Sequence, residues 1–185
     1  MLIQFCVENF LSIREKAVLS LLASNDKDHP SHCILSENFL CLKFAVLYGT
    51  NGSGKSNVLT AFEFTVNYVM SSHAKQLNCP TNRVPFKFSK KLAVTPSSFE
   101  VIFIQDGIRY AYGFSATDKE ITDEYLYHYA NGKRVVIFER TNTDRYQFTA
   151  DVELQNKLKD RNLGNRLYLS TAANWNYEKV KPAFQ

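Results

Sequence analysis

The sequence predicts an α/β protein in which a glycine-rich loop joins an apolar strand to an amphipathic helix, and an antiparallel meander follows. A continuous apolar run of buried-strand length, residues 44–48, leads directly into the loop at residues 49–56. Apolar residues then recur at helical spacing over residues 55–70. From about residue 98 to residue 149, short alternating runs are separated by turn residues.

Composition bounds the class of protein. The chain has 185 residues, of which 45% are hydrophobic and 22% charged, with a formal net charge of +4. These values are typical of a soluble globular domain with one core and exclude a mainly disordered chain. The mild positive charge permits a nucleic-acid partner without arguing for one.

The cysteines and the hydropathy pattern favour a cytoplasmic protein. Cys6, Cys33, Cys41 and Cys79 show no metal-site or disulfide spacing, so a reducing compartment is expected. Cys6 and Cys41 lie in apolar runs and are predicted to be core residues. No apolar run is long enough to cross a membrane, so no membrane partner is expected.

The N-terminal part is predicted to contain two short strands, over residues 2–7 and residues 17–23. Polar and turn-forming residues make residues 24–36 a predicted loop. After the helix at residues 55–70, residues 71–85 contain Pro80 and Pro85 and are predicted to be an exposed connection.

The meander is predicted from its turns. Asp106-Gly107 and Asn131-Gly132 are pairs that suit the positive φ angles of tight hairpins. The predicted strands are residues 99–105, 108–115, 121–130, 133–140 and 145–149.

Two surface features each have two interpretations. Tyr125, Tyr127 and Tyr129 share one strand face; cross-strand packing is the ordinary use of such a row, and a stacking platform for bases is the alternative. Lys87, Lys90 and Lys91 form the densest basic cluster, for which a solvated loop is the ordinary interpretation.

The C-terminal part is predicted to be short and mixed. Asp151 is a plausible N-cap for a helix through residue 159, and Gly164 a plausible end of that segment. Residues 166–170 alternate like a short strand, and a helical pattern begins at Asn174.

The glycine-rich segment carries the chemistry. It fits the P-loop pattern G-x-x-x-x-G-K-S/T at every required position. Backbone N–H groups and the start of the helix would hold phosphate, Lys55 would contact the β- and γ-phosphates, and the Ser56 hydroxyl would bind Mg²⁺. The predicted nucleotide-binding residues are Gly49, Asn51, Gly52, Ser53, Gly54, Lys55, Ser56 and Asn57. The expected ligands are therefore a purine nucleoside triphosphate and Mg²⁺; the motif spacing alone does not separate ATP from GTP, and ATP is what the resemblance described next implies.

Two motifs resemble a known group of ATPases. "VENFLSI" followed by "LYGTNGSGKSNVL" is similar to the N-terminus of ABC-type ATPases of the SMC, RecF and OLD groups, most of all bacterial OLD/RecF-like AAA proteins. The similarity extends from Met1 to about Asn176 and includes "FEVIFIQDGIRYAYGF" and "ITDEYLYHYANG". It implies a P-loop NTPase lobe of ABC-ATPase type, with a mixed sheet and an antiparallel meander beside the P-loop strand and helix.

The resemblance also implies a function and partners. ATP would be sandwiched between two copies and would control a partner activity, with a nuclease or DNA as candidate partners. Several proteins of the resembled group serve in anti-phage defence.

Further residues come near the nucleotide by this resemblance. Asn51 would lie on the γ-phosphate side, and Asn9 and Ser12 would approach from the first-strand turn, although both are also ordinary turn residues. Arg14 stands two residues after that serine, whereas the SMC branch has a basic residue before it. The junction at residues 169–174 holds no glutamine, so Ser170 or Asn174 would take the place of the family's Q-loop residue.

The catalytic acids of such ATPases are missing from the sequence. No four-residue apolar run after Ser56 ends in two acids, and no signature segment follows. We therefore expect residues 1–170 to be an N-terminal ATP-binding lobe and residues 171–185 the truncated start of a helical lobe. Hydrolysis would then require a C-terminal half. The alternatives are a nucleotide-dependent interaction module without turnover and a small P-loop kinase, against which the long meander argues.

Overall fold

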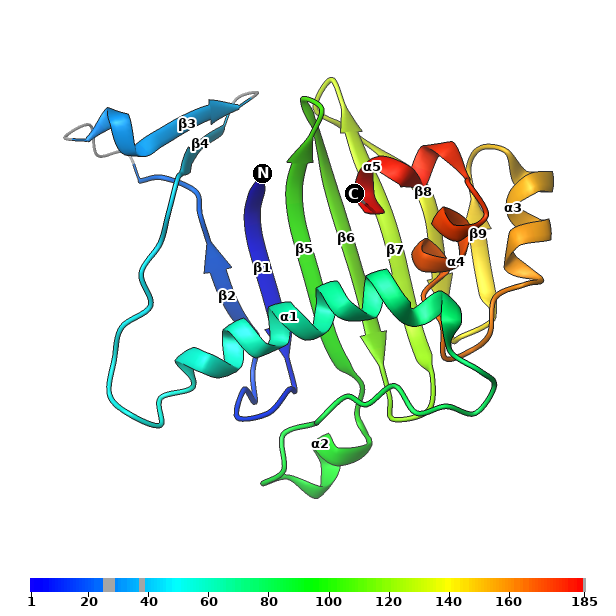
Figure 1. Cartoon of the computed structure of the whole chain (residues 1–185), viewed down its shortest axis with the longest axis horizontal. Coiled ribbons are helices and arrows are strands. Elements are labelled where there is room, and N and C mark those ends of the chain that lie inside the picture. The colour runs from blue at the N-terminus through cyan, green and yellow to red at the C-terminus, as the bar shows by residue number, and fades with distance from the viewer. Residues whose placement is uncertain (25–28, 37–38, 185) are drawn as a thin grey trace.

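A seven-stranded sheet is the frame of the molecule (Figure 1). The computed structural model describes residues 1–24, 29–36 and 39–184. The strand order is β2-β1-β5-β6-β7-β8-β9, and each neighbouring pair is antiparallel. The strands are β1 (Leu2–Glu8), β2 (Ala17–Ser20), β5 (Ser97–Gln105), β6 (Ile108–Ala116), β7 (Ile121–Ala130), β8 (Lys133–Thr141) and β9 (Arg145–Phe148). The α/β class and the meander are confirmed, but this sheet is antiparallel throughout rather than mixed.

Both predicted hairpin turns of the meander are confirmed. Asp106 and Gly107 have φ angles of 51° and 73°, and Asn131 and Gly132 have φ angles of 52° and 73°. Positive φ at both central residues gives the turn twist that matches the twist of the flanking strands. The turn chemistry therefore fixes how β5 pairs with β6 and how β7 pairs with β8.

One long helix, α1 (Lys55–Ser71), crosses one face of the sheet (Figure 1). Its aromatic side chains meet aromatic side chains of the strands, as in the pairs Phe5–Phe62 and Phe64–Phe99, whose ring centroids are each 5.2 Å apart. The other helices are η1 (Pro30–His32), η2 (Ser72–Ala74), α2 (Lys90–Val94), α3 (Val152–Lys159), α4 (Tyr168–Asn174), η3 (Glu178–Val180) and α5 (Lys181–Phe184). The predicted helix at residues 55–70 is thus confirmed. Among the described helices, none combines the length and the hydropathy that a membrane span needs.

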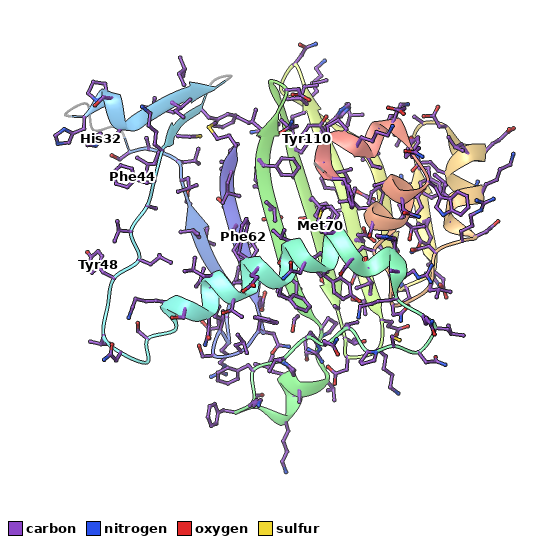
Figure 2. The ribbon with its side chains drawn as sticks, viewed as in Figure 1. His32, Phe44, Tyr48, Phe62, Met70 and Tyr110 are labelled. Carbon is purple, nitrogen blue, oxygen red and sulfur yellow. The ribbon has the colours of Figure 1, made fainter. Side chains whose placement is uncertain are left out.

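The apolar segment before the P-loop is not a strand, so that prediction is wrong. Residues 44–48 form no backbone hydrogen bond within the described parts of the chain. Val46 is 72% exposed and Tyr48 is 91% exposed. A strand needs a neighbour for its peptide groups, and β1 already has β2 and β5 on its two edges. Figure 2 shows Phe44 and Tyr48 on this segment, apart from the large sheet.

The predicted strand at residues 166–170 is also wrong, because α4 begins at Tyr168. The backbone N–H groups of Tyr168 and Leu169 donate to the carboxylate of Glu124, at 2.6 and 2.9 Å. A buried carboxylate from β7 therefore satisfies the amides that open the helix. The expected domain boundary at residue 170 falls inside α4, and buried residues lie on both sides of it, including Leu169 and Ala172.

Helix α3 confirms the predicted helix over residues 151–159, but not its cap. Asp151 precedes the helix in a left-handed conformation, and its side chain makes no capping hydrogen bond. Its carboxylate instead contacts the Tyr177 hydroxyl and the Lys179 ammonium. These contacts tie the start of α3 to the C-terminal helices.

Two loops are more ordered than their composition indicates. Within the predicted loop at residues 24–36, β3 (Cys33–Ser36) pairs with β4 (Phe39–Leu42); Asn25, Asp26 and Asp28 lie outside the described residues. In the predicted exposed connection at residues 71–85, Ser72, Thr81 and Arg83 are buried.

Two cysteines and the tyrosine row of β7 test the remaining predictions about packing. Cys6 and Cys41 are buried, as predicted. Tyr125 and Tyr127 lie on the sheet face opposite α1 and stack on each other, with ring centroids 4.7 Å apart. A Cβ atom on Gly113 would lie 2.5 Å from the Tyr125 ring, so this tyrosine packs directly on the neighbouring strand. Cross-strand packing is therefore confirmed for Tyr125.

Candidate functional site

The P-loop holds three glycines in the left-handed region. Gly49, Gly52 and Gly54 have φ angles of 152°, 81° and 92°. A residue with a Cβ atom is strained in this region. The backbone shape therefore requires glycine at these three positions.

The first turn of α1 offers free donors. The helical bonds begin with the N–H groups of Asn57 and Val58, both of which donate to the carbonyl of Gly54. Gly54 is the N-cap residue, and no side chain caps the helix. In the described structure the N–H groups of Lys55 and Ser56 have no partner. Together with the helix dipole they make an electropositive end suited to an anion.

The Lys55 side chain is held in place by hydrogen bonds to the P-loop backbone. Its ammonium donates to the carbonyls of Gly49 and Thr50, at 2.8 Å each, and lies 3.4 Å from the Ser53 hydroxyl. An ammonium has three N–H donors; two make short bonds that orient the group, and the third makes only the long contact to Ser53, which a ligand could replace. The arrangement presents one positive charge at the mouth of the loop without an acidic partner in the described residues.

The other predicted loop residues are accessible. Asn51 and Ser56 are exposed, and their side chains form no hydrogen bond within the described parts of the chain. Ser53 is also exposed, and its N–H donates to the carbonyl of Thr50 at 3.3 Å. The Ser56 hydroxyl is therefore available, which fits the predicted role as a Mg²⁺ ligand.

The turn after β1 contacts the P-loop helix through Ser12. The Asn57 side chain donates to the Ser12 hydroxyl at 2.6 Å. A Cβ atom on Gly54 would lie 3.2 Å from the same hydroxyl. The structure thus places Ser12 beside the loop, with one donor of the Asn57 amide bound to it, and nucleotide contacts of Ser12 and Asn57 remain predictions.

Asn9 has a structural role in this turn. The residue is 1% exposed, and its amide donates to the carbonyls of Leu92 and Thr95 at 2.8 Å each, and to that of Pro96 at 3.3 Å. Its side-chain oxygen accepts from the N–H of Phe86 at 3.0 Å. All polar atoms of the side chain are used, so the turn interpretation describes Asn9 and the nucleotide-proximal one does not.

Arg14 has the opposite character. It is exposed, and its guanidinium makes no ion pair or hydrogen bond with any described residue. It stands two residues from Ser12, which touches the P-loop helix. A contact between Arg14 and nucleotide remains a prediction.

Ser170 lies at the wrong end of α1 to meet the nucleotide, which corrects the expectation for this residue. Its hydroxyl accepts from the N–H of His73 at 3.1 Å, just beyond the last residue of the helix. A helix of 17 residues is about 25 Å long. Ser170 is fully buried there, and Asn174 ends the same short helix α4.

Among the described residues, the acid that is buried is Glu124, and its contacts stabilise the fold. Glu124 accepts from the Tyr112 hydroxyl at 3.0 Å and lies 3.7 Å from the Arg140 guanidinium. Burial raises the pKa of this carboxyl above its ordinary value, although Arg140 and the amides of α4 oppose the shift. Among the described residues, no group of three or more His, Cys, Asp or Glu side chains could hold a metal ion. Glu124 is thus occupied inside the meander and does not face the P-loop.

The sequence analysis did not identify Arg83, a buried residue whose side chain binds several backbone carbonyls near the site. Arg83 is 6% exposed and donates to the carbonyls of Ala93 and Thr95, while pairing with Asp118 at 2.7 Å. With Asn9 it fixes the segment after residue 85. The sequence shows that no Asp or Glu lies between Glu63 and Glu100, but no residue near Arg83 in the sequence indicates that its side chain is buried.

Comparison with known proteins assigns a family. A family model described as "AAA domain, putative AbiEii toxin, Type IV TA system" matches residues 44–181, about three quarters of the chain. The matched region begins at the apolar segment before the P-loop and includes α1 and the whole meander. No curated protein matches the sequence.

Proposed function

The chain belongs to the AAA domain family described as putative AbiEii toxin of type IV toxin–antitoxin systems, and we propose that it binds ATP with Mg²⁺ through residues 49–56. The family supports a nucleotide-binding P-loop ATPase of AAA/ABC type. The observation that carries the proposal is the convergence of free N–H groups and the oriented Lys55 ammonium at the start of α1.

The residues present fit the nucleotide and its metal. The N–H groups of Lys55 and Ser56 would hold the β-phosphate, and the third donor of the Lys55 ammonium would reach the γ-phosphate. The Ser56 hydroxyl would be a Mg²⁺ ligand. The metal neutralises phosphate charge when it is bound, and the exposed Asn51 would border the γ-phosphate.

We propose further that a second unit completes the site. Residues 44–48 and the exposed α1 side chains of Leu59, Val66 and Met70 present apolar surface to solvent. A cavity of about 270 Å³ between α1 and the sheet borders Val66 and Met70. Large exposed apolar surface typically marks an interface. A C-terminal half or a second copy that covers this side would also close over the open P-loop.

Such a unit would supply the carboxylates for hydrolysis. An ATPase needs an acid to polarise water, and Glu124, the fully buried acid, is committed to Arg140 and α4. We propose that the assembled protein hydrolyses ATP in a nucleotide-sandwich dimer that controls a partner, such as a nuclease or a DNA-bound complex, in anti-phage defence or DNA maintenance. The unpaired state of all four cysteines is consistent with a cytoplasmic location. No acid of the described residues pairs with Lys55, which supports the alternative of an interaction module without turnover.

Binding is tested by calorimetric titration of ATP with Mg²⁺ into the wild-type chain and Lys55→Ala. The variant should bind at least about tenfold more weakly, because a charge-assisted contact to phosphate is lost. Lys133→Ala, which removes an exposed lysine from the β7–β8 hairpin, is the matched control and should bind normally. Equal heats for Lys55→Ala and wild type would overturn the P-loop assignment.

Completion of the site is tested by sedimentation with and without ATP and Mg²⁺. We expect association that depends on nucleotide and is lost in Lys55→Ala, together with phosphate release near background for this chain alone. A sedimentation profile indifferent to nucleotide would refute the sandwich, and rapid turnover that requires Ser56 would refute the need for outside acids.

A further inference from the structure

A short basic segment projects from the sheet on the same side as the P-loop. We call residues 86–94 the basic knob; it contains α2, which Figure 1 shows beyond the strand ends at which the β1–β2 turn lies. The N–H of Leu11 in that turn donates to the carbonyl of Val84 at 2.8 Å, and the neighbouring Ser12 contacts the P-loop helix. The chain just before the basic knob is therefore bonded to the turn whose Ser12 contacts the P-loop helix.

The side chains of the basic knob face solvent. Phe88 is 92% exposed and Val94 is 78% exposed. The three lysines of the segment are exposed and make no ion pair with any described residue: Lys87, Lys90 and Lys91. The Phe88 ring has one printed neighbour, the edge-on ring of Phe86 with centroids 5.8 Å apart, so most of its surface is left for a partner.

The backbone of the basic knob is held rigidly. Asn9 binds the carbonyls of Leu92 and Thr95, and Arg83 binds those of Ala93 and Thr95. The Ser89 hydroxyl accepts from the N–H of Leu92 and caps the short helix. The N–H of Phe86 also donates to the Asn9 side chain at 3.0 Å, so hydrogen bonds hold the segment on both sides of Phe88. Pre-organisation of this kind lowers the entropy cost of binding a partner.

The charge of the region selects the partner. No Asp or Glu lies between Glu63 and Glu100. Within this interval Arg83 is paired with Asp118, which leaves the lysines of the basic knob as an unopposed positive patch. Ammonium groups complement phosphates, and an exposed ring complements the flat face of an unpaired base.

We infer that the basic knob binds single-stranded nucleic acid, with the lysines on the phosphate backbone and Phe88 stacked against a base. Duplex is disfavoured because its bases are already stacked, so the ring gains nothing there. This inference does not depend on nucleotide binding at the P-loop.

The test is fluorescence anisotropy of the chain with a labelled oligothymidylate about 20 nucleotides long, compared with a duplex of equal length. The wild-type chain should prefer the single strand and lose affinity as salt rises. Replacing the three lysines by alanine should reduce the salt slope by about 2, since each phosphate contact on a single strand contributes about 0.7.

Phe88→Ala should weaken binding by about tenfold while leaving the salt slope unchanged, and Phe88→Trp should retain binding, because stacking is not ionic. Lys133→Ala is the matched control for loss of an exposed lysine outside the basic knob. Equal thermal melts of all variants, expected for changes at exposed side chains, show that the fold is intact.

Three results would overturn the inference. They are unchanged affinity in Phe88→Ala, equal affinity for duplex and single strand, and binding to phosphatidylserine vesicles without binding to the oligonucleotide. Because the assay contains no ATP, loss of binding in Lys55→Ala would not be expected, and the two proposals fail separately.

Discussion

Substitution of Asn9 tests whether this residue holds the fold or the nucleotide. The side chain makes two hydrogen bonds of 2.8 Å and one of 3.0 Å to backbone groups of residues far along the chain. At about 1 kcal/mol for each bond, Asn9→Gly should lower the free energy of unfolding by about 3 kcal/mol. Glycine tolerates the φ angle of 54°, so this variant removes the hydrogen bonds without adding backbone strain.

Asn9→Ala should be worse by about 1 kcal/mol, because alanine also pays for the left-handed conformation. Urea denaturation without nucleotide measures both values, and a loss of 3 kcal/mol corresponds to a midpoint shift of about 1.5 M for a urea m-value of about 2 kcal/mol/M. Asn131→Gly is the control: Asn131 has φ 52° in an exposed hairpin, and its loss should change stability by less than about 0.5 kcal/mol.

Measurement without nucleotide distinguishes the structural role of Asn9 from a role in nucleotide binding. Because the partners of Asn9 are all protein groups, the loss should appear in full without ATP. If Asn9→Gly unfolds at the wild-type midpoint, and a difference emerges when ATP and Mg²⁺ are added, the structural role assigned here is refuted.

Two other changes probe the meander. Arg140→Met should cost about 3–5 kcal/mol at neutral pH by leaving the buried Glu124 carboxylate unpaired, and the added change Glu124→Gln should restore part of the loss in chemical denaturation. Burial raises the pKa of Glu124, so a protonated Glu124 stabilises the fold at low pH, and this contribution is lost as pH rises through the folded-state pKa. The free-energy penalty of Arg140→Met should therefore shrink on acidification. A penalty that does not change with pH would contradict an ionised Glu124. Gly113→Ala should cost about 1–3 kcal/mol by overpacking against the Tyr125 ring, and combination with Tyr125→Ala should cost less than the sum of the two single changes, whereas additivity would disprove the contact.

Features set by a few adjacent residues were predictable from the sequence. The two hairpins follow from turn pairs that need positive φ, such as Asn131-Gly132. The P-loop and α1 follow from glycine placement and helical periodicity, and the structure keeps the predicted start at Lys55. In these segments the local preference and the tertiary environment agree, so little else was needed.

Features set by distant residues were not predictable. Residues 166–170 alternate like a strand, yet Glu124, more than 40 positions earlier, supplies the acceptors that open α4. Residues 44–48 have the composition of a buried strand but lack a neighbouring strand in the described structure. Their exposure therefore depends on whether another strand or chain covers them. Asn9 appeared to be a turn residue at the site, and only the path of residues 86–96 shows what its amide binds.

The two ends of α1 are restrained unequally, and this difference bears on how the site would respond to a ligand. At the C-terminal end, Tyr68 donates to the carbonyl of Asn165 at 2.7 Å, and the N–H of His73 donates to the buried Ser170. At the N-terminal end, Asn57 meets the sheet through the Ser12 hydroxyl, which belongs to a turn rather than to the core. A phosphate on the Lys55 and Ser56 amides would therefore lie beside the Ser12 contact and about a helix length from the Tyr68 and His73 contacts. That turn leads through Leu11 to Val84 and the basic knob, so the structure connects the phosphate site to the segment with the most exposed aromatic ring rather than to the buried meander.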